Sequence, residues 1–296
     1  MMRAEAALAG IQTAPRRTGF ARGFVHGLAR KPLGTVGAVI CVAFLFCGVF
    51  AGTLAPYGMN QISPPNRLQA PSVQHPLGTD HLGRDLLSRV LYGARVSVII
   101  GFSAAGLSVL ISVALGIVSG YFGGRTDAIV QRFVDAWMCF PALIVLIVFV
   151  AVVGTGTFQI VVLLGLVYGI GGSRIVRSAV LPIKEQLFVE AARSLGAGAG
   201  AILRRHILPN VLPPVIVLFT AQVGTVILTE ASLSFLGLGV PPGTPSWGGM
   251  LADGKNVLLQ APHVSIFPGV CILLAVLGCN LLGDALADWL DPRLRE

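Results

Sequence analysis

Charged residues are scarce in this chain of 296 residues. Asp, Glu, Lys and Arg together make up 11% of the sequence, and the mean hydropathy is +0.81. Soluble domains carry about 25% charged residues, so water is not the main solvent of this protein. The composition therefore excludes an ordinary soluble domain and predicts a membrane protein.

Aromatic residues interleaved with basic ones are also absent. The net charge is +8, which by itself would suggest a nucleic-acid partner. However, the basic residues fall in short tracts between apolar runs and show no aromatic interleaving. Orientation in a bilayer explains these tracts better, so we expect a lipid bilayer as partner and no nucleic acid.

Neither a C-x-x-C spacing nor a cleavable signal peptide is present. Residues 1–32 are basic and contain no apolar core near the start, and the first apolar run begins at Leu33 and is long enough to span a bilayer. That run is therefore interpreted as a retained helix. All five cysteines lie in apolar stretches, which favours small hydrophobic core residues over disulfides or a metal site: Cys41, Cys47, Cys139, Cys271 and Cys279.

Long apolar runs dominate what is present. A bilayer core of about 30 Å needs roughly 20 apolar residues in a helix. Six runs meet this requirement, and they predict an all-α membrane protein with six transmembrane helices. We expect Pro141 to kink the third helix. The runs cover residues 33–55, 96–120, 129–152, 158–174, 211–235 and 264–286.

The distribution of basic residues predicts the orientation. If the N-terminus is cytoplasmic, sixteen of the 21 Lys and Arg residues fall in cytoplasmic segments. This bias favours both termini inside the cell. The expected organisation is a cytoplasmic tail, a first helix, an extracytoplasmic segment, a permease core that contains a cytoplasmic loop, and a second tail. These parts cover residues 1–32, 33–55, 56–94, 95–287 with the loop at 182–210, and 288–296.

The polar loop is expected to contain two short helices. Pro182 to Leu195 predicts one helix, which Gly196 and Gly198 can end by adopting positive φ. Ala201 to Ile207 predicts the second, and Pro209 suits the start of the next long helix.

The composition of this loop suits contact with another protein. Ala191 and Ala192 leave room for close approach of a partner. Charged side chains can anchor that partner, namely Glu190, Arg193, Arg204 and Arg205. The alternative is an ordinary basic loop, which any membrane protein can have.

Residue by residue, this segment resembles the EAA loop of ABC importer permeases. The resemblance implies the type I importer permease fold and makes the loop a coupling helix that sits in a groove of the ATP-binding subunit. His206 departs from the family, which often has Ile there. The matching residues are Glu190, Ala191, Ala192, Gly196, Leu208 and Pro209.

A second motif runs from His75 to Ser97 and is similar to the C-type permeases of dipeptide, oligopeptide and nickel importers. Residues 229–251 and 280–295 resemble the same branch, although Ala287 stands where the family usually has a basic residue. A dipeptide or short oligopeptide is the substrate that this resemblance implies. Nickel complexes, glutathione and other peptide-like solutes remain alternatives.

The acidic residues of the second motif have structural interpretations. Asp80 is a candidate helix N-cap, and Asp85 can pair with Arg89 four residues later. His75, Asp80, His81 and Asp85 do not match a usual zinc or calcium spacing. We therefore expect no metal site.

Two acidic residues lie in or near predicted spans. Each would cost about 3 kcal/mol at the bilayer centre, so both should face protein or water. Glu230 is interpreted either as part of the translocation path or as paired with a neighbouring helix or the partner permease. For Asp135, pairing is favoured.

The chain shows no ATP-binding motif of its own. Gly249 to Lys255 fits most of a phosphate-binding loop, but Asn256 replaces the Ser or Thr that holds Mg²⁺, and no strand is predicted before it. The resemblance implies that ATP and Mg²⁺ bind in partner subunits, namely two ATPases. It also implies a second homologous permease and an extracytoplasmic solute-binding protein.

A stand-alone secondary transporter is a competing hypothesis, but such proteins often show internal repeats, and none is visible here. A membrane enzyme would need a catalytic cluster, which the sequence does not show.

Overall fold

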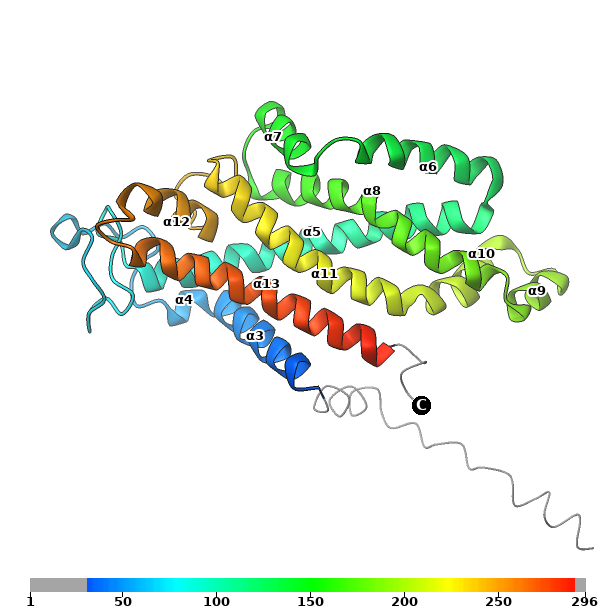
Figure 1. Ribbon diagram of the computed structural model, residues 1–296, viewed down its shortest axis with the longest axis horizontal. Helices are drawn as coiled ribbons and strands as arrows, with labels where there is room; N and C mark the ends of the chain where they lie inside the picture. Colours follow the sequence, from blue (N-terminus) through cyan, green and yellow to red (C-terminus); the bar gives the residue numbers. More distant parts are fainter. Residues whose placement is uncertain (1–30, 291–296) are drawn as a thin grey trace, which may run out of the picture.

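The computed structural model describes residues 31–290, which form a bundle of long helices (Figure 1). The predicted tails therefore fall almost entirely outside the described residues. Within 31–290 no strand occurs beyond an isolated bridge between Thr79 and Asp85. The helices are α3 Pro32–Val49, α4 Ala51–Leu54, α5 Leu86–Phe122, α6 Gly124–Met138, α7 Ala142–Val153, α8 Thr157–Lys184, α9 Leu187–Ser194, α10 Ala199–Ile202, α11 Leu208–Phe235, α12 Trp247–Gly254 and α13 His263–Leu290, with the short 3₁₀ helices η1 Pro64–Asn66 and η3 Lys255–Val257 and the π-helical turn η2 Leu203–Ile207.

Five helical segments are long and apolar enough to cross a membrane, and a sixth span exists if α6 and α7 are taken together. The prediction of all-helical spans is thus confirmed. The third span differs from the expected kinked helix, because α6 and α7 meet at 83°. Pro141 is the N-cap of α7 and lacks an N–H, and a residue before proline is disfavoured in the α region. The helix therefore breaks before Pro141.

Two spans are longer than their apolar runs. α5 begins at Leu86 rather than near residue 96, and α8 continues to Lys184 rather than ending near residue 174. The extra turns of α8 carry Arg177, whose Nε donates to Asp127 Oδ1 of α6 at 2.6 Å. Because the half-buried guanidinium is paired with Asp127, a charged residue does not end the helix here.

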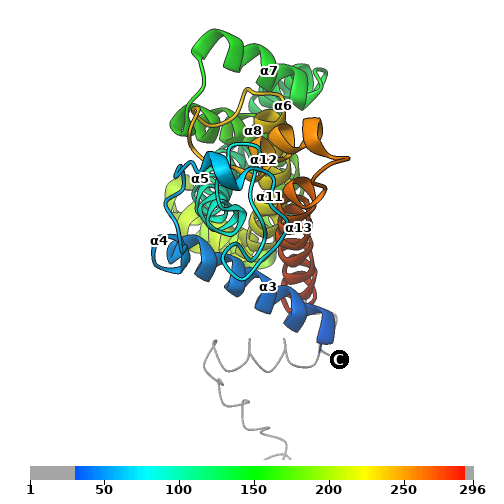
Figure 2. The same cartoon turned by 90° about the vertical axis from the view of Figure 1, so that its left-hand side faces the viewer.

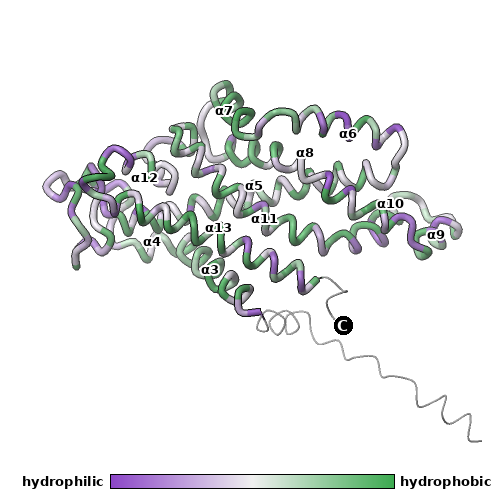
Figure 3. Tube along the Cα trace, viewed as in Figure 1, coloured by the Kyte–Doolittle hydropathy of each residue, from purple (hydrophilic) through white to green (hydrophobic). Residues whose placement is uncertain are grey.

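The bundle is elongated, with polar segments at its two ends (Figures 1 and 3). The segment before α5 and the helix α12 lie at one end, whereas α9 and α10 lie at the other. α3 lies along the outside of the bundle beside α13 (Figure 2). An ion pair between Lys31 and Asp288 joins the two ends of the described chain.

Glycines allow α5 and α8 to pack closely, and this is the most extensive helix pair. A Cβ added at Gly116 of α5 would lie 2.6 Å from Val176 Cβ and 2.7 Å from Ser173 O of α8. A Cβ at Gly169 of α8 would lie 2.8 Å from Ser108 O of α5. Small residues at such contacts let the helix backbones approach, which drives association in membranes.

We expect Gly116→Ala to destabilise the bundle by about 1–3 kcal/mol, the usual cost of overpacking a core. Gly106→Ala is the matched control, because Gly106 lies on the same helix and nothing lies within 4 Å of its added Cβ. Thermal unfolding in detergent measures the difference. Equal stability of the two variants would contradict the close approach of α5 and α8.

Candidate functional site

The candidate coupling loop, residues 185–207, connects α8 with α11 through two short helices. The prediction of one helix from Pro182 to Leu195 is wrong at its start. Pro182 belongs to α8, which ends at Lys184, and α9 begins at Leu187 after a short non-helical connection. Val176 and Val180 are buried among residues of α5 and the loop. This packing stabilises the last turns of α8, so the helix continues through Pro182. α10 and the turn η2 form the expected second helical piece and lead directly into α11.

Gly196 ends α9 in the way its residue type predicts. It adopts φ +79°, and its N–H donates to Arg193 O at 3.0 Å, while Ala197 N donates to Ala192 O at 3.0 Å. These two bonds are those of a Schellman motif, which satisfies the carbonyls at a helix C-terminus. The same expectation for Gly198 is wrong: its φ is −68°, and it is the N-cap of α10.

Apolar side chains fasten the loop to the bundle. Val189 of α9 is fully buried, as are Ile202 and Ile207. All three belong to one cluster with Val180 of α8 and Val211 of α11. A displacement of the loop must therefore move the ends of these two long helices with it.

The other side of the loop is open to solvent. Glu190, Arg204 and Arg205 are exposed, and none of their side chains forms a hydrogen bond or ion pair within the described part of the chain. Leu187 and Leu195 are 81% and 88% exposed. The sequence does not identify these two leucines as surface residues, because apolar character alone does not distinguish surface from core.

The remaining predicted loop residues have different surroundings. Ala191 is exposed and Ala192 is half-buried, while Leu208 is half-buried and Pro209 is exposed at the start of α11. The guanidinium carbon of Arg193 lies 6.0 Å from the centre of the Tyr121 ring, which fits a cation–π contact.

His206, where the resemblance to the EAA loop is imperfect, has a structural contact. Its ring centre lies 5.8 Å from that of Phe188. It therefore braces α9 against η2.

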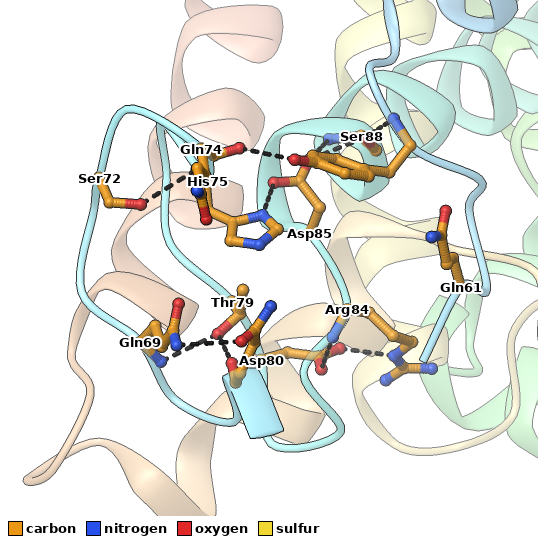
Figure 4. A network of polar contacts seen from close by, with 12 residues as sticks. Gln61, Gln69, Ser72, Gln74, His75, Thr79, Asp80, Arg84, Asp85 and Ser88 are labelled. Atoms are coloured by element: carbon orange, nitrogen blue, oxygen red, sulfur yellow. Dashed lines mark hydrogen bonds and ion pairs between the residues drawn. The ribbon is translucent and has the colours of Figure 1, made fainter. Parts of the chain in front are cut away.

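The opposite end of the bundle carries a buried polar network (Figure 4). Asp85 accepts from Ser88 N at 2.8 Å and from Ser88 Oγ at 2.7 Å, and its other oxygen lies 2.9 Å from His75 Nδ1. Asp85 is thus the N-cap of α5, and the expectation that Asp80 is a helix N-cap is wrong. The expected pair of Asp85 with Arg89 is also wrong, because His75 and Ser88 occupy the carboxylate.

Asp80 instead organises the turn before α5. It accepts from the N–H groups of Leu82 and Arg84 and from Arg84 Nε at 2.6 Å (Figure 4). Arg84 Nη2 reaches Asp253 of α12 at 3.3 Å. The acidic residues of this motif are therefore engaged with protein donors, and no group of three metal-ligating side chains occurs among residues 31–290.

The two acidic residues of the spans differ in burial. Asp135 is half-exposed and paired with Arg174 of α8. Glu230 of α11 is 1% exposed, and its Oε1 accepts from Ser234 Oγ at 2.6 Å, whereas its Oε2 has no hydrogen-bond partner in the described structure.

Gly249 to Gly254 lie within α12, so this stretch is a helix and not a phosphate-binding loop.

Comparison with known families adds to this geometry. Residues 112–296 match the family described as "Binding-protein-dependent transport system inner membrane component". Residues 19–71 match the "N-terminal TM domain of oligopeptide transport permease C".

Two curated relatives are similar over most of their length. The dipeptide transport system permease protein DppC of Alkalihalophilus pseudofirmus is 39% identical over 91% of this chain and 88% of the relative. The glutathione transport system permease protein GsiD of Escherichia coli is 40% identical over 92% of this chain and 90% of the relative.

A solved structure is similar in fold. A chain of the MetNI methionine ABC transporter, in an inward-facing conformation, aligns with a TM-score of 0.55 and 20% identity over 69% of this chain and 96% of that chain. The family match excludes the stand-alone secondary transporter. The chain belongs to the binding-protein-dependent transport system inner membrane components: it is a multi-pass permease subunit of the inner membrane whose ATPase resides in separate subunits.

Proposed function

We propose that this permease moves dipeptides or short oligopeptides into the cell. The similarity to a dipeptide permease over most of both chains is the observation that carries the proposal. A glutathione-type solute is the second candidate, because the similarity to GsiD is equally extensive. Transport of nickel complexes is supported only by the resemblance of residues 75–97, so it is the weaker proposal.

The coupling loop is proposed as the contact with the ATPases. Its exposed surface combines Glu190, Arg204 and Arg205 with the apolar side chains of Leu187 and Leu195. A buried apolar centre with charges around it is the usual composition of a protein interface. In this arrangement the loop faces the cytoplasm, as the distribution of Lys and Arg predicts.

The rigid attachment of the loop supports a mechanical role. Val189 and Ile207 are fully buried against the ends of α8 and α11. When the ATPases close on ATP, displacement of α9 would tilt both helices and switch the pathway between outward-facing and inward-facing states. This requires that the ATPases bind the loop with different free energies in the two states.

One chain of this kind supplies half of a pathway. The proposed assembly contains a second homologous permease, two ATPases and an extracytoplasmic solute-binding protein. Residues 56–94 and 236–263, at the end of the bundle opposite the coupling loop, are the proposed docking surface for the binding protein. Glu230 lies buried just below this end, where it can face the translocation path.

Reconstituted uptake tests the proposal. The full assembly in liposomes is expected to accumulate labelled dialanine only when ATP and Mg²⁺ are present on the ATPase side. This permease pair without ATPases is expected to give no accumulation. Accumulation by this chain alone without ATP would refute the proposal, and uptake of glutathione in place of dialanine would favour the second candidate.

A further inference from the structure

A pocket of about 390 Å³ opens at the end of the bundle opposite the coupling loop. Its walls come from four parts of the chain: the segment before and within the first turns of α5, the connection between α7 and α8, the end of α11 with the loop after it, and α12. Its volume lies within the range of about 300–1,000 Å³ that small-molecule sites occupy. The polar lining residues are His81, Arg84, Arg89, Thr155, Ser234, Thr244, Ser246 and Asp253.

Arg89 is the unusual member of this lining. It is only 6% exposed, yet its Nε and Nη1 have no hydrogen-bond partner in the described structure. The closest carboxylate oxygens are Asp80 Oδ2, 3.6 Å from Nε, and Asp253 Oδ2, 3.8 Å from Nη2. Both distances exceed that of a hydrogen bond, so these carboxylates balance the charge without satisfying the donors.

The neighbouring acidic groups are hydrogen-bonded to Arg84 rather than to Arg89. Asp80 already accepts from two backbone N–H groups and from Arg84 Nε. Asp253 accepts from Arg84 Nη2. A second lining residue, His81, also has a buried Nδ1 without a partner. Buried unpaired polar atoms are rare in native structures, and each requires a partner such as water, an ion or a ligand.

We propose that Arg89 binds the free carboxylate of the transported solute in this pocket. The guanidinium is planar and presents paired donors that match a carboxylate. A pocket of this volume accepts a small solute as a whole. The inference rests on the proposed function, because it assumes that the solute is a peptide with a free C-terminus.

Ser234 connects this pocket with Glu230. Its hydroxyl lines the pocket and donates to Glu230 Oε1, while Glu230 Oε2 is unpaired. The pocket and the buried carboxylate of α11 therefore share the Ser234 side chain.

The test compares dialanine with dialanine amide in the complete reconstituted transporter. The measured quantity is the ratio of their uptake rates at subsaturating concentrations, and the same binding protein serves every variant. Its own preference for the acid therefore cancels when permease variants are compared. The variants are Arg89→Gln, Arg89→Lys and the control Arg95→Gln. Arg95 lies on the same helix as Arg89, but its side chain donates to Gly48 O and Val49 O outside the pocket.

Arg89→Gln is expected to lower the acid-to-amide ratio roughly tenfold or more, because hydrogen bonds to charged groups are stronger than neutral ones. Arg89→Lys should give an intermediate ratio, since an ammonium keeps the charge but not the paired donors. Arg95→Gln should keep the original ratio. If Arg89→Gln does not assemble, the ratio of Arg89→Lys decides.

Three results would overturn the inference. An unchanged ratio in both Arg89 variants would show that Arg89 does not contact the solute carboxylate. An equal loss for acid and amide would assign Arg89 to an acidic side chain of the binding protein instead. If the unsubstituted transporter moves neither compound with ATP, the proposed function itself fails, and the inference fails with it.

Discussion

Gly196→Val is expected to lower ATP-driven uptake severely while the bundle stays folded. Gly196 adopts φ +79°, and a β-branched residue is a genuine outlier in that region. The strain is about 2 kcal/mol or more, which corresponds to roughly a 30-fold loss of the correctly folded loop. The Schellman bonds of Gly196 and Ala197 would break, and the exposed surface of α9 would lose its fixed position.

The effect should remain local. Nothing lies within 4 Å of a Cβ built at Gly196, so no packing is disturbed. We expect the melting temperature of the detergent-solubilised permease to fall by only a few degrees, as a strain of about 2 kcal/mol implies, and the ATPases to dissociate during co-purification. Uptake and ATPase recovery are measured on the same preparations.

Gly198→Val is the matched control for this prediction. Gly198 is also exposed and has open space around it, but its φ of −68° and ψ of 155° suit any residue. It should therefore retain both ATPases and uptake. Equal loss in Gly196→Val and Gly198→Val would assign the effect to side-chain bulk at the interface and contradict the role of the positive φ.

Asp85→Ala should strongly destabilise the segment before α5. It removes the N-cap of α5, the bond to Ser88 Oγ and the partner of the buried His75. A lost cap costs about 1 kcal/mol, and a buried polar group left without its partner costs about 1–3 kcal/mol. We expect a loss of about 2–4 kcal/mol, measured by thermal or denaturant unfolding in detergent.

Ser246→Ala provides a control for capping alone. Ser246 is buried and caps α12 through a single bond from Gly249 N at 3.1 Å. Its loss should cost about 1 kcal/mol. If Asp85→Ala were no more destabilising than Ser246→Ala, the buried pair with His75 would contribute nothing to stability.

Asp85→Ala should also reduce uptake, because Arg89 stands one turn after Asp85 on α5. Fraying of that turn would move the guanidinium from its pocket. Asp85→Asn keeps an oxygen that can accept from Ser88 N, so it should fall between the original protein and Asp85→Ala in both stability and uptake.

Several features of the fold follow from local residue patterns. Apolar runs of about 20 residues predict spans because a bilayer core demands that length, and five such helices are present. Gly196 ends a helix through positive φ because it lacks a Cβ. Pro209 stands in the first turn of α11, where its fixed φ suits a helix. These properties depend on the chain within a few residues, so the sequence is sufficient.

Other features depend on residues that are far apart in the chain. α8 extends beyond its apolar run because Arg177 forms an ion pair with Asp127 of α6. Hydropathy along the chain cannot predict this pairing. The role of Asp85 was misassigned because its partner His75 is held in place by a folded turn rather than by helical spacing. The unpaired donors of Arg89 become visible only when α5, α12 and the loop after α11 enclose them, since burial is a property of the whole packed bundle and not of any one segment.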